Sequence, residues 1–307
     1  MRSIVITEET SNKKIDKAIK ELFPRMPASA MYKAFRKKDV KVNGVRVKDD
    51  YIVLLGDRLE LYITDDILDG KGFSLNSGFS IVYEDVNLLI VNKEQGIPVH
   101  PDKDQVSNTL IDLVQAYLKE KGEYSPHKSD SFPPSLCHRL DRNTGGLLII
   151  AKNEKSLKVM LDKIKSKEVK KYYQCLVSGR MQKQEEELKA YLTKDERKSR
   201  VFIDDKRTRD SLEIVTRYRV LSYENNISKL EIELVTGRTH QIRAHLAHIG
   251  HPIIGDGKYG TNAINRPLKA KFQALWAYKL KFSFCSDAGI LNYLKGKTFE
   301  VKPTFKI

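Results

Sequence analysis

Hydrophobic residues recur at helical spacing near the start of the chain. Between Lys14 and Leu22 the apolar positions lie three or four residues apart, which predicts an amphipathic helix. Pro24 and Pro27 interrupt this pattern, and Ser29 can cap a second helix that runs to about residue 38. The first part of the chain therefore predicts two short helices with a proline-containing break between them.

The next segment alternates between apolar and polar residues, as a strand does. Residues 40–42 and 45–47 both alternate, and Asn43-Gly44 stands between them. Asn-Gly between two alternating segments is the strongest short signal for a β-hairpin, because both residues tolerate the backbone angles of its turn. Leu59 and Leu61 alternate with charged residues in the same way and predict a further strand.

The remaining three quarters of the chain, from about residue 80, combine many strand patterns with few helical ones. Alternation or enrichment in strand formers predicts strands, and helical spacing with capping residues such as Asn153 predicts helices. Because helices do not alternate regularly with strands, we expect an α+β fold with a mostly antiparallel mixed sheet and a central cleft. The predicted strands are 81–83, 88–91, 147–151, 171–177, 217–220, 229–234 and 277–284, and the predicted helices are 109–118, 154–165 and 239–249.

Composition narrows the class of protein. The chain has 307 residues, of which 40% are hydrophobic and 31% charged, and its net charge is +15. Such an excess of positive charge favours a polyanionic partner. No segment approaches the roughly 18 apolar residues of a membrane span, and the N-terminus lacks a secretory signal. Three widely spaced cysteines exclude a disulfide framework and suggest buried, reduced thiols.

The charge is concentrated in the first segment. From Ser11 to Lys48 there are twelve Lys or Arg residues against three acids. Turn residues and little apolar periodicity follow over residues 65–79, as is typical of a linker. We therefore predict a small basic module at residues 12–64, whose charge suits a polyanion such as nucleic acid, a linker at 65–79, and a larger domain at 80–307.

One string carries candidate chemistry. Cys137 to Gly146 reads CHRLDRNTGG, which places Asp141 between Arg139 and Arg142. Nearby cations favour the ionised form of a carboxylate, and an ionised, oriented Asp can act as a nucleophile. By itself this spacing fits a structural ion pair at least as well as a catalytic group.

The longer string HRLDRNTGGLLIIAK resembles the signature of the RluA family of pseudouridine synthases, which isomerise chosen uridines in structured RNA. Further motifs follow in the family's order, including KYYQCLVSG from Lys171 and GRTHQIR from Gly237. Three positions depart from the family pattern: Gly145, where Ser is usual, Cys175, where Ala is more frequent, and Trp276, where His is usual. We expect Gly145 to change the stiffness of its loop more than the chemistry.

The resemblance implies a reaction without cofactor, in which the bond between N1 of uracil and C1′ of ribose breaks and C5 is joined to the sugar instead. It implies Asp141 as nucleophile, Arg243 as its ion-pair partner, and Tyr173 as the residue that stacks on the target base and assists proton removal. Tyr172 should face the other side of its strand. The target base must leave the helical stack to reach such a site.

The resemblance also implies how RNA is held. Arg139 is expected to help fill the gap left by the flipped nucleotide, because a guanidinium can stack on bases and bind phosphate. The basic module resembles a small module named after a ribosomal small-subunit protein. The expected RNA-binding residues are Arg139, Lys33, Arg36, Lys37, Lys38, Lys41 and Arg238.

The substrate and some alternatives stay open at this point. The basic module looks most like that of the RluC branch, which acts on 23S rRNA, and transfer RNA is the second possibility. A non-catalytic RNA-binding assembly factor is an alternative. The histidines at 240, 245, 248 and 251 admit a metal-dependent hydrolase, although their spacing does not place three on one helix face. We expect no metal, no membrane partner, a monomer, and a cytoplasmic location.

Overall fold

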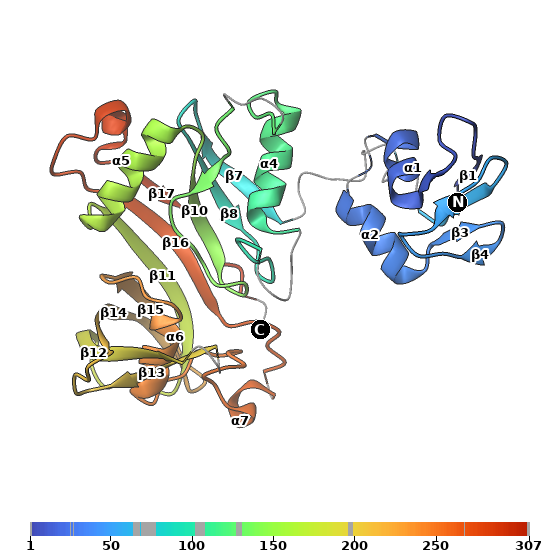
Figure 1. Cartoon of the computed structure of the whole chain (residues 1–307). Helices are drawn as coiled ribbons and strands as arrows, with labels where there is room; N and C mark the ends of the chain where they lie inside the picture. The colour runs from blue at the N-terminus through green and yellow to red at the C-terminus, as the bar shows by residue number, and fades with distance from the viewer. Residues whose placement is uncertain are drawn as a thin grey trace. The chain divides into compact units, whose positions relative to one another are not determined.

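The computed structural model divides the chain into two compact units, residues 1–77 and 78–307 (Figure 1). It describes residues 2–24, 26, 28–63, 68, 78–101, 108–126, 131–195, 199–266 and 268–305. The first unit begins earlier than the predicted module 12–64, because its first strand pairs with its last. The second begins before residue 80, because its first strand starts at Phe79. Most of the predicted linker 65–79 lies outside the described residues.

The first unit packs two helices against small sheets. One sheet has the strand order β1-β6-β3-β4, and β2 pairs with β5. The helices bury an apolar stripe that includes Ile15, Ile19 and Met31, which are at most 1% exposed. The second helix starts at Ala28, so Ser29 lies inside its first turn and not at its cap. The elements are β1 (Arg2–Val5), β2 (Lys13–Lys14), α1 (Ile15–Leu22), α2 (Ala28–Lys37), β3 (Val40–Val42), β4 (Val45–Arg46), β5 (Ile52–Val53) and β6 (Arg58–Leu61).

The predicted hairpin is present, and a distant aspartate fixes its turn. Asn43 and Gly44 have φ angles of 52° and 80°, the left-handed values that an Asn-Gly turn supplies at low cost. The Asn43 side chain donates to Asp57 at 2.8 Å and accepts from the Arg58 amide at 2.8 Å. The N-G turn and the later G-D pair therefore form one hydrogen-bonded unit.

The second unit is built on one eleven-stranded, mostly antiparallel sheet, as expected. The strand order is β13-β12-β14-β15-β11-β16-β10-β8-β7, with β17 beside β16 and β9 beside β10. Its elements are β7 (Phe79–Glu84), β8 (Leu88–Lys93), α4 (Leu110–Glu120), β9 (Ser135–Leu136), β10 (Gly145–Ala151), α5 (Glu154–Lys165), β11 (Val169–Ser178), β12 (Glu185–Asp195), β13 (Arg200–Asp204), β14 (Leu212–Glu224), β15 (Ile227–Leu234), α6 (Gln241–His248), α7 (Asn262–Asn265), β16 (Leu275–Phe282), η1 (Gly289–Leu294) and β17 (Thr298–Glu300).

The strand that follows Asp141 is buried on both faces. Leu148 and Ile150 pack with α4, whereas Leu147 and Ile149 pack with α5 residues such as Met160. All four strand residues are fully buried. A run of consecutive apolar residues is what a strand covered on both sides requires, so LLII anchors the segment that carries Asp141.

β10 also takes part in the parallel strand pairing of this sheet. β10 pairs with β16 in parallel, Gly145 opposite Trp276 and Gly146 opposite Ala277, and its other partners are antiparallel. The parallel pairing connects the side that ends in β7 with the longer side that ends in β13 (Figure 1).

Several sequence-based details differ from the structure. Strands β12 and β13 were not predicted. Helix α6 begins at Gln241 and not at residue 239, because His240 has the left-handed φ of 54°. Cys285 is exposed, whereas Cys137 and Cys175 are buried as expected. In the described parts of the chain, no helix combines the length and hydropathy that crossing a bilayer needs.

Candidate active site

Asp141 lies at the end of the segment that precedes β10, on a loop held from several sides. The Lys93 ammonium donates to the Arg142 carbonyl at 3.0 Å, and the Gly96 amide donates to the same carbonyl at 2.9 Å. The Gln95 side chain donates to the Asn143 carbonyl at 2.9 Å. These bonds fix the backbone next to Asp141, which is the pre-organisation that a nucleophile needs.

Lys93 is a buried part of this support. Its side chain is fully buried, and its ammonium also donates to the carbonyls of Glu94 at 2.8 Å and Ile97 at 2.9 Å. Burial lowers the pKa of Lys93 to about 7, against the opposing charge of Asp141. Three carbonyl acceptors match the three protons of the ammonium form. Lys93 therefore stabilises the loop that carries Asp141.

The ion pair of Asp141 runs to Arg243 on α6, as expected. Arg243 Nη1 donates to Asp141 Oδ2 at 2.8 Å. The rest of the guanidinium is held by Asp256, to which Nε donates at 2.7 Å and Nη2 at 3.0 Å. This fork-like geometry leaves Nη1 aimed at Asp141.

The electrostatics of this triad follow from its burial. Asp256 is fully buried, and burial alone would raise the pKa of its carboxyl. The hydrogen bonds and charge of Arg243 outweigh that effect and hold the pKa of Asp256 below its usual value. The pKa of Arg243 is raised in turn by Asp256 and Asp141, against the effect of burial. The guanidinium therefore stays charged between two carboxylates.

Tyr173 lies on β11 in the same site and is 5% exposed. Burial, together with the charge of Asp141, raises the pKa of the Tyr173 hydroxyl. A raised pKa disfavours the phenolate in the free enzyme, and the ring of Tyr173 lines the cavity. Tyr172 faces the other side of the strand, with the Lys279 ammonium 5.2 Å from its ring centre.

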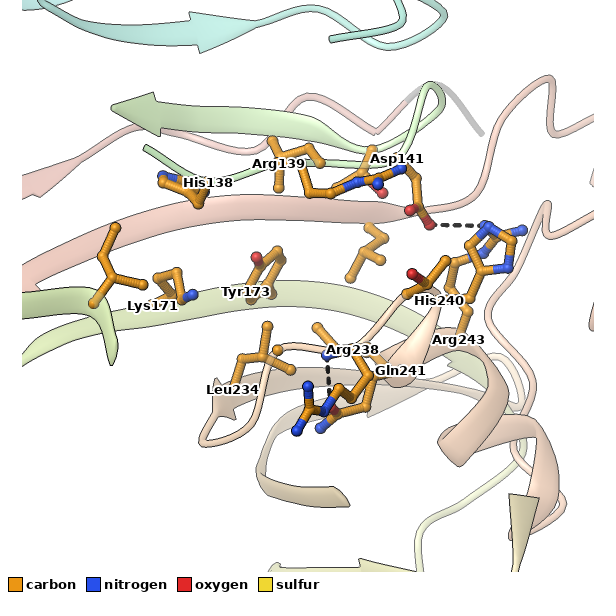
Figure 2. Close-up of a pocket in the computed structure, with 17 residues that line it drawn as sticks. His138, Arg139, Asp141, Lys171, Tyr173, Leu234, Arg238, His240, Gln241 and Arg243 are labelled. Atoms are coloured by element: carbon orange, nitrogen blue, oxygen red, sulfur yellow. Dashed lines mark hydrogen bonds and ion pairs between the residues drawn. The ribbon is translucent and has the colours of Figure 1, made fainter. Parts of the chain in front are cut away.

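Asp141, Arg243 and Tyr173 line one cavity of about 270 Å³. Figure 2 shows Tyr173 between Lys171 and the Asp141–Arg243 pair. Arg139 and Arg238 are exposed residues that line the same cavity, and their contact with RNA stays a prediction. Asp141, Arg243, Tyr173, Arg139 and Arg238 come from three separate sequence motifs, and the fold brings all five together.

Gly145 packs directly against the ring of Trp276. A Cβ atom at this position would lie 2.5, 2.6 and 2.7 Å from three carbons of the Trp276 ring. Trp276 is 4% exposed and occupies the space that a serine side chain would need. The departures at Gly145 and Trp276 are therefore one feature, a tryptophan packed over a glycine.

Each of the four clustered histidines contacts a different protein group. His240 Nδ1 lies 3.0 Å from the Tyr259 hydroxyl, and His245 Nδ1 lies 3.1 Å from the Thr216 hydroxyl. His248 contacts Asp205, and His251 contacts the Ser178 carbonyl. Within the described residues no group of three or more His, Cys, Asp or Glu side chains could hold a metal ion.

The first unit carries a basic groove of its own. Arg36 and Lys38 at the end of α2 line it together with Arg46, Lys48 and the aromatic residues Tyr32 and Phe35. Of the other expected RNA-binding residues, Lys37 is exposed on α2, and Lys41 lies over the Tyr62 ring at 4.6 Å. The side chain of Lys33 lies outside the described residues.

The sequence reasoning missed residues that support the site. Asp256 belongs to the string GDGKYG, which showed no chemical role by spacing alone, and Lys93 lies in a strand where a buried ammonium was not expected. His138 was taken as structural, and its Nε2 does accept a hydrogen bond from the Ile149 amide at 3.2 Å. Burial and the Lys171 charge lower the pKa of His138 to about 3, so its ring is neutral at pH 7.

Comparisons with known proteins agree with this arrangement. The family model of RNA pseudouridylate synthase matches residues 87–248. An uncharacterized RNA pseudouridine synthase of Aquifex aeolicus is 32% identical, over 89% of this chain and 87% of its own length. Ribosomal large subunit pseudouridine synthase C of Buchnera aphidicola subsp. Baizongia pistaciae is 32% identical, over 87% of this chain and 83% of its own.

Solved structures show the same fold. Human RNA pseudouridylate synthase domain containing 1 superposes with a TM-score of 0.57 at 24% identity, and covers 70% of this chain and 82% of its own. The family match identifies the chain as an RNA-modifying enzyme. From the family match and the relatives, the chain belongs to the RluA-type RNA pseudouridylate synthases and is an RNA pseudouridine synthase.

Proposed function

We propose that this protein isomerises specific uridines of 23S rRNA, with Asp141 as nucleophile and the target base flipped into the cavity. The observation that carries the proposal is the Asp141–Arg243 ion pair at 2.8 Å beside a buried tyrosine. The Asp141 side chain is 22% exposed, so an incoming nucleotide can reach it.

The geometry assigns a task to each group. The Asp141 loop is fixed by backbone hydrogen bonds, and Arg243 orients the carboxylate, so little reorganisation is needed when it attacks. Tyr173 offers a flat buried face on which a flipped uracil can stack, a contact worth about 1–3 kcal/mol. The cavity is recessed between protein side chains, so the target nucleotide must leave the RNA helix to enter it.

The choice of 23S rRNA rests on the relatives and on the basic module. Proteins named ribosomal large subunit pseudouridine synthase C match 84–87% of this chain at 31–32% identity. The groove of the first unit combines four cationic residues with aromatic rings, a surface suited to an RNA backbone. We further propose that the enzyme is a cytoplasmic monomer that uses neither metal nor cofactor.

A product assay tests the proposal. The purified full chain is incubated with unmodified large-subunit rRNA in the presence of a chelator, and pseudouridine is mapped by primer extension after base-specific derivatisation. We expect product with the wild type, none with Asp141→Asn, and unchanged product with Asp210→Asn, a matched change of an exposed residue.

The same assay separates the alternatives. Product with transfer RNA transcripts, and none with ribosomal RNA, would overturn the substrate. Tight RNA binding without any product would favour the assembly-factor alternative. Loss of product on chelation would favour a metal-dependent reaction, and full activity of Asp141→Asn would overturn the role of Asp141.

A further inference from the structure

Lys171 is a cation in the cavity that the reaction described so far does not use. It lies on β11 two residues before Tyr173, and both side chains line the cavity. Figure 2 shows Lys171 at the end of the cavity away from Asp141. Its ammonium reaches the loop before α6, where a Cβ added to Gly237 would lie 3.7 Å from Nζ.

This ammonium has no anionic partner among the described residues. No described carboxylate lies within ion-pair distance of Lys171 Nζ, and no described group accepts a hydrogen bond from it. Burial lowers the pKa of Lys171 with no opposing charge. Lys171 is partly buried. A partly desolvated charge without a partner is costly, and such groups occur preferentially at functional sites.

The surroundings of Lys171 indicate what it meets. Ile164 and Leu234 line the cavity with it, and His138, which also lines the cavity, is neutral at pH 7. A hydrated phosphate fits poorly into such a half-apolar end, whereas a flat base stacked on Tyr173 brings its edge oxygens to this side. The missing partner is therefore a group that becomes anionic on the base.

We propose that Lys171 is a catalytic residue that stabilises the negative charge which develops on uracil when its bond to the ribose breaks. The inference rests on the proposed function, because it takes the stacked base on Tyr173 as its starting point. It assigns to this chain the group that holds the detached base, a role left open by Asp141, Arg243 and Tyr173.

The charge in question arises from the balance of the reaction. When N1–C1′ breaks heterolytically, its electron pair stays on uracil and spreads over N1, O2 and O4, while the sugar is held by the Asp141 carboxylate. The pair returns when C5 bonds to C1′ and releases Asp141, and a proton then moves from C5 to N1. An ammonium beside O2 or O4 stabilises only the intermediate stage, as an oxyanion hole does.

Lys171→Met tests the proposal, with Lys170→Met as the matched control. Met preserves the length and apolar stem of the side chain without the charge. Lys170 is the preceding residue on β11, and its side chain is 42% exposed. For both variants we would measure the single-turnover rate with saturating enzyme, the Kd for RNA, its salt dependence, and the thermal midpoint.

We expect Lys171→Met to lower the single-turnover rate by about 10²–10³-fold, as the loss of one oxyanion-stabilising donor does. The Kd for RNA should stay within twofold of the wild type, because the charge is absent in the ground state. The thermal midpoint should stay equal or rise, because an unpaired, partly buried charge is removed. Lys170→Met should match the wild type in rate.

Each other outcome overturns the inference. A wild-type rate in Lys171→Met would exclude a catalytic role, and a lower thermal midpoint would indicate a structural one. A weaker Kd, with a log–log salt slope reduced by about 0.7–0.9, would mean that Lys171 binds a backbone phosphate and not the base. Absence of product with the wild type would overturn the proposed function itself and is distinguishable from all of these.

Discussion

At the scale of single residues, two aspartates share one guanidinium but contribute differently. Asp256 is fully buried and accepts two hydrogen bonds from Arg243, whereas the Asp141 side chain is 22% exposed and accepts one. Stability and chemistry are thus divided between the two carboxylates. The partly exposed Asp141 can therefore serve as the proposed nucleophile, because the buried Asp256 holds the arginine.

This division predicts that removing Asp256 mainly lowers the free energy of unfolding, whereas removing Asp141 mainly lowers activity. We expect Asp256→Ala to lower the free energy of unfolding by about 3 kcal/mol, because it leaves a buried arginine poorly paired. Asp141→Ala should lower it by less than about 1 kcal/mol, as for partly exposed pairs, yet abolish product. Urea unfolding of both variants measures the difference, and equal decreases in the two variants would contradict it.

The contact between Gly145 and Trp276 gives a second prediction at this scale. Gly145→Ser should destabilise the protein by about 1–3 kcal/mol through overpacking, because the new Cβ meets the indole. In a Trp276→His background the same change should cost less, since the smaller ring leaves space. A double-mutant cycle by urea unfolding measures this coupling.

Gly146→Ala provides the control for this cycle. Gly146 has a φ of 117°, and an added Cβ would overlap the backbone of Ala277, which no side-chain change can move. Trp276→His should therefore not rescue it. Equal rescue of both glycine substitutions would show that the indole is not the obstacle at Gly145.

At the scale of elements, strong local patterns predicted structure well. Asn153 caps α5 by accepting from the Ser156 amide, and α5 spans the predicted Glu154–Lys165. Strand β12 was missed although Leu188, Ala190 and Leu192 alternate in it, because its many charged residues obscure the alternation. Where strands pair, and that β10 joins β16 in parallel, cannot be predicted from local pattern, since it depends on contacts distant in sequence.

Helix α6 carries a prediction about pH. Burial lowers the pKa of His245 to about 4, and the residue is 1% exposed. Between pH 6.5, the usual value for histidine, and about 4, the unfolded chain binds a proton that the folded chain refuses. This one residue should therefore lower the free energy of unfolding by up to about 3 kcal/mol as the pH falls through that window.

His245→Gln tests the effect, because Gln can still hydrogen-bond to Thr216 but does not titrate. Urea unfolding at a series of pH values from 7.5 to 4.5 should show a shallower decline for the variant than for the wild type. Parallel curves would mean that His245 is protonated in the folded protein, contrary to its burial.

At the scale of the whole molecule, the candidate site was predictable in part. Asp141, Arg243 and Tyr173 were identified through motifs, and the fold assembles them around one cavity. Asp256, Lys93 and Lys171 were not identified, because their importance lies in burial and in partners far along the chain. A carboxylate or an ammonium in a sequence string carries no sign of whether it will be desolvated.

The positive charge of the first unit predicts how RNA binding depends on salt. Neutralising Arg36, Lys37 and Lys38 together, all exposed on or just after α2, should weaken binding. The log–log salt slope should fall by up to about 0.7–0.9 for each RNA phosphate that these side chains no longer neutralise. Filter binding over a series of salt concentrations measures both quantities.

The control neutralises Lys281, Lys295 and Lys302, three exposed lysines of the second unit, and so makes the same change in net charge. If both triplets flatten the slope equally, total charge and not a local contact governs binding. An unchanged slope in the first triplet would show that those residues do not touch the RNA backbone.

The parallel pairing of β10 with β16 places the candidate catalytic residues where the two sides of the sheet meet. Asp141 enters from the β7 side of this narrow seam, and Arg243 reaches it from the β13 side. The Asp141–Arg243 ion pair is consequently also a contact between the two sides of the sheet. If Asp141 reacts as proposed, a substitution that displaces one side of the sheet relative to the other should separate its carboxylate from the guanidinium that orients it.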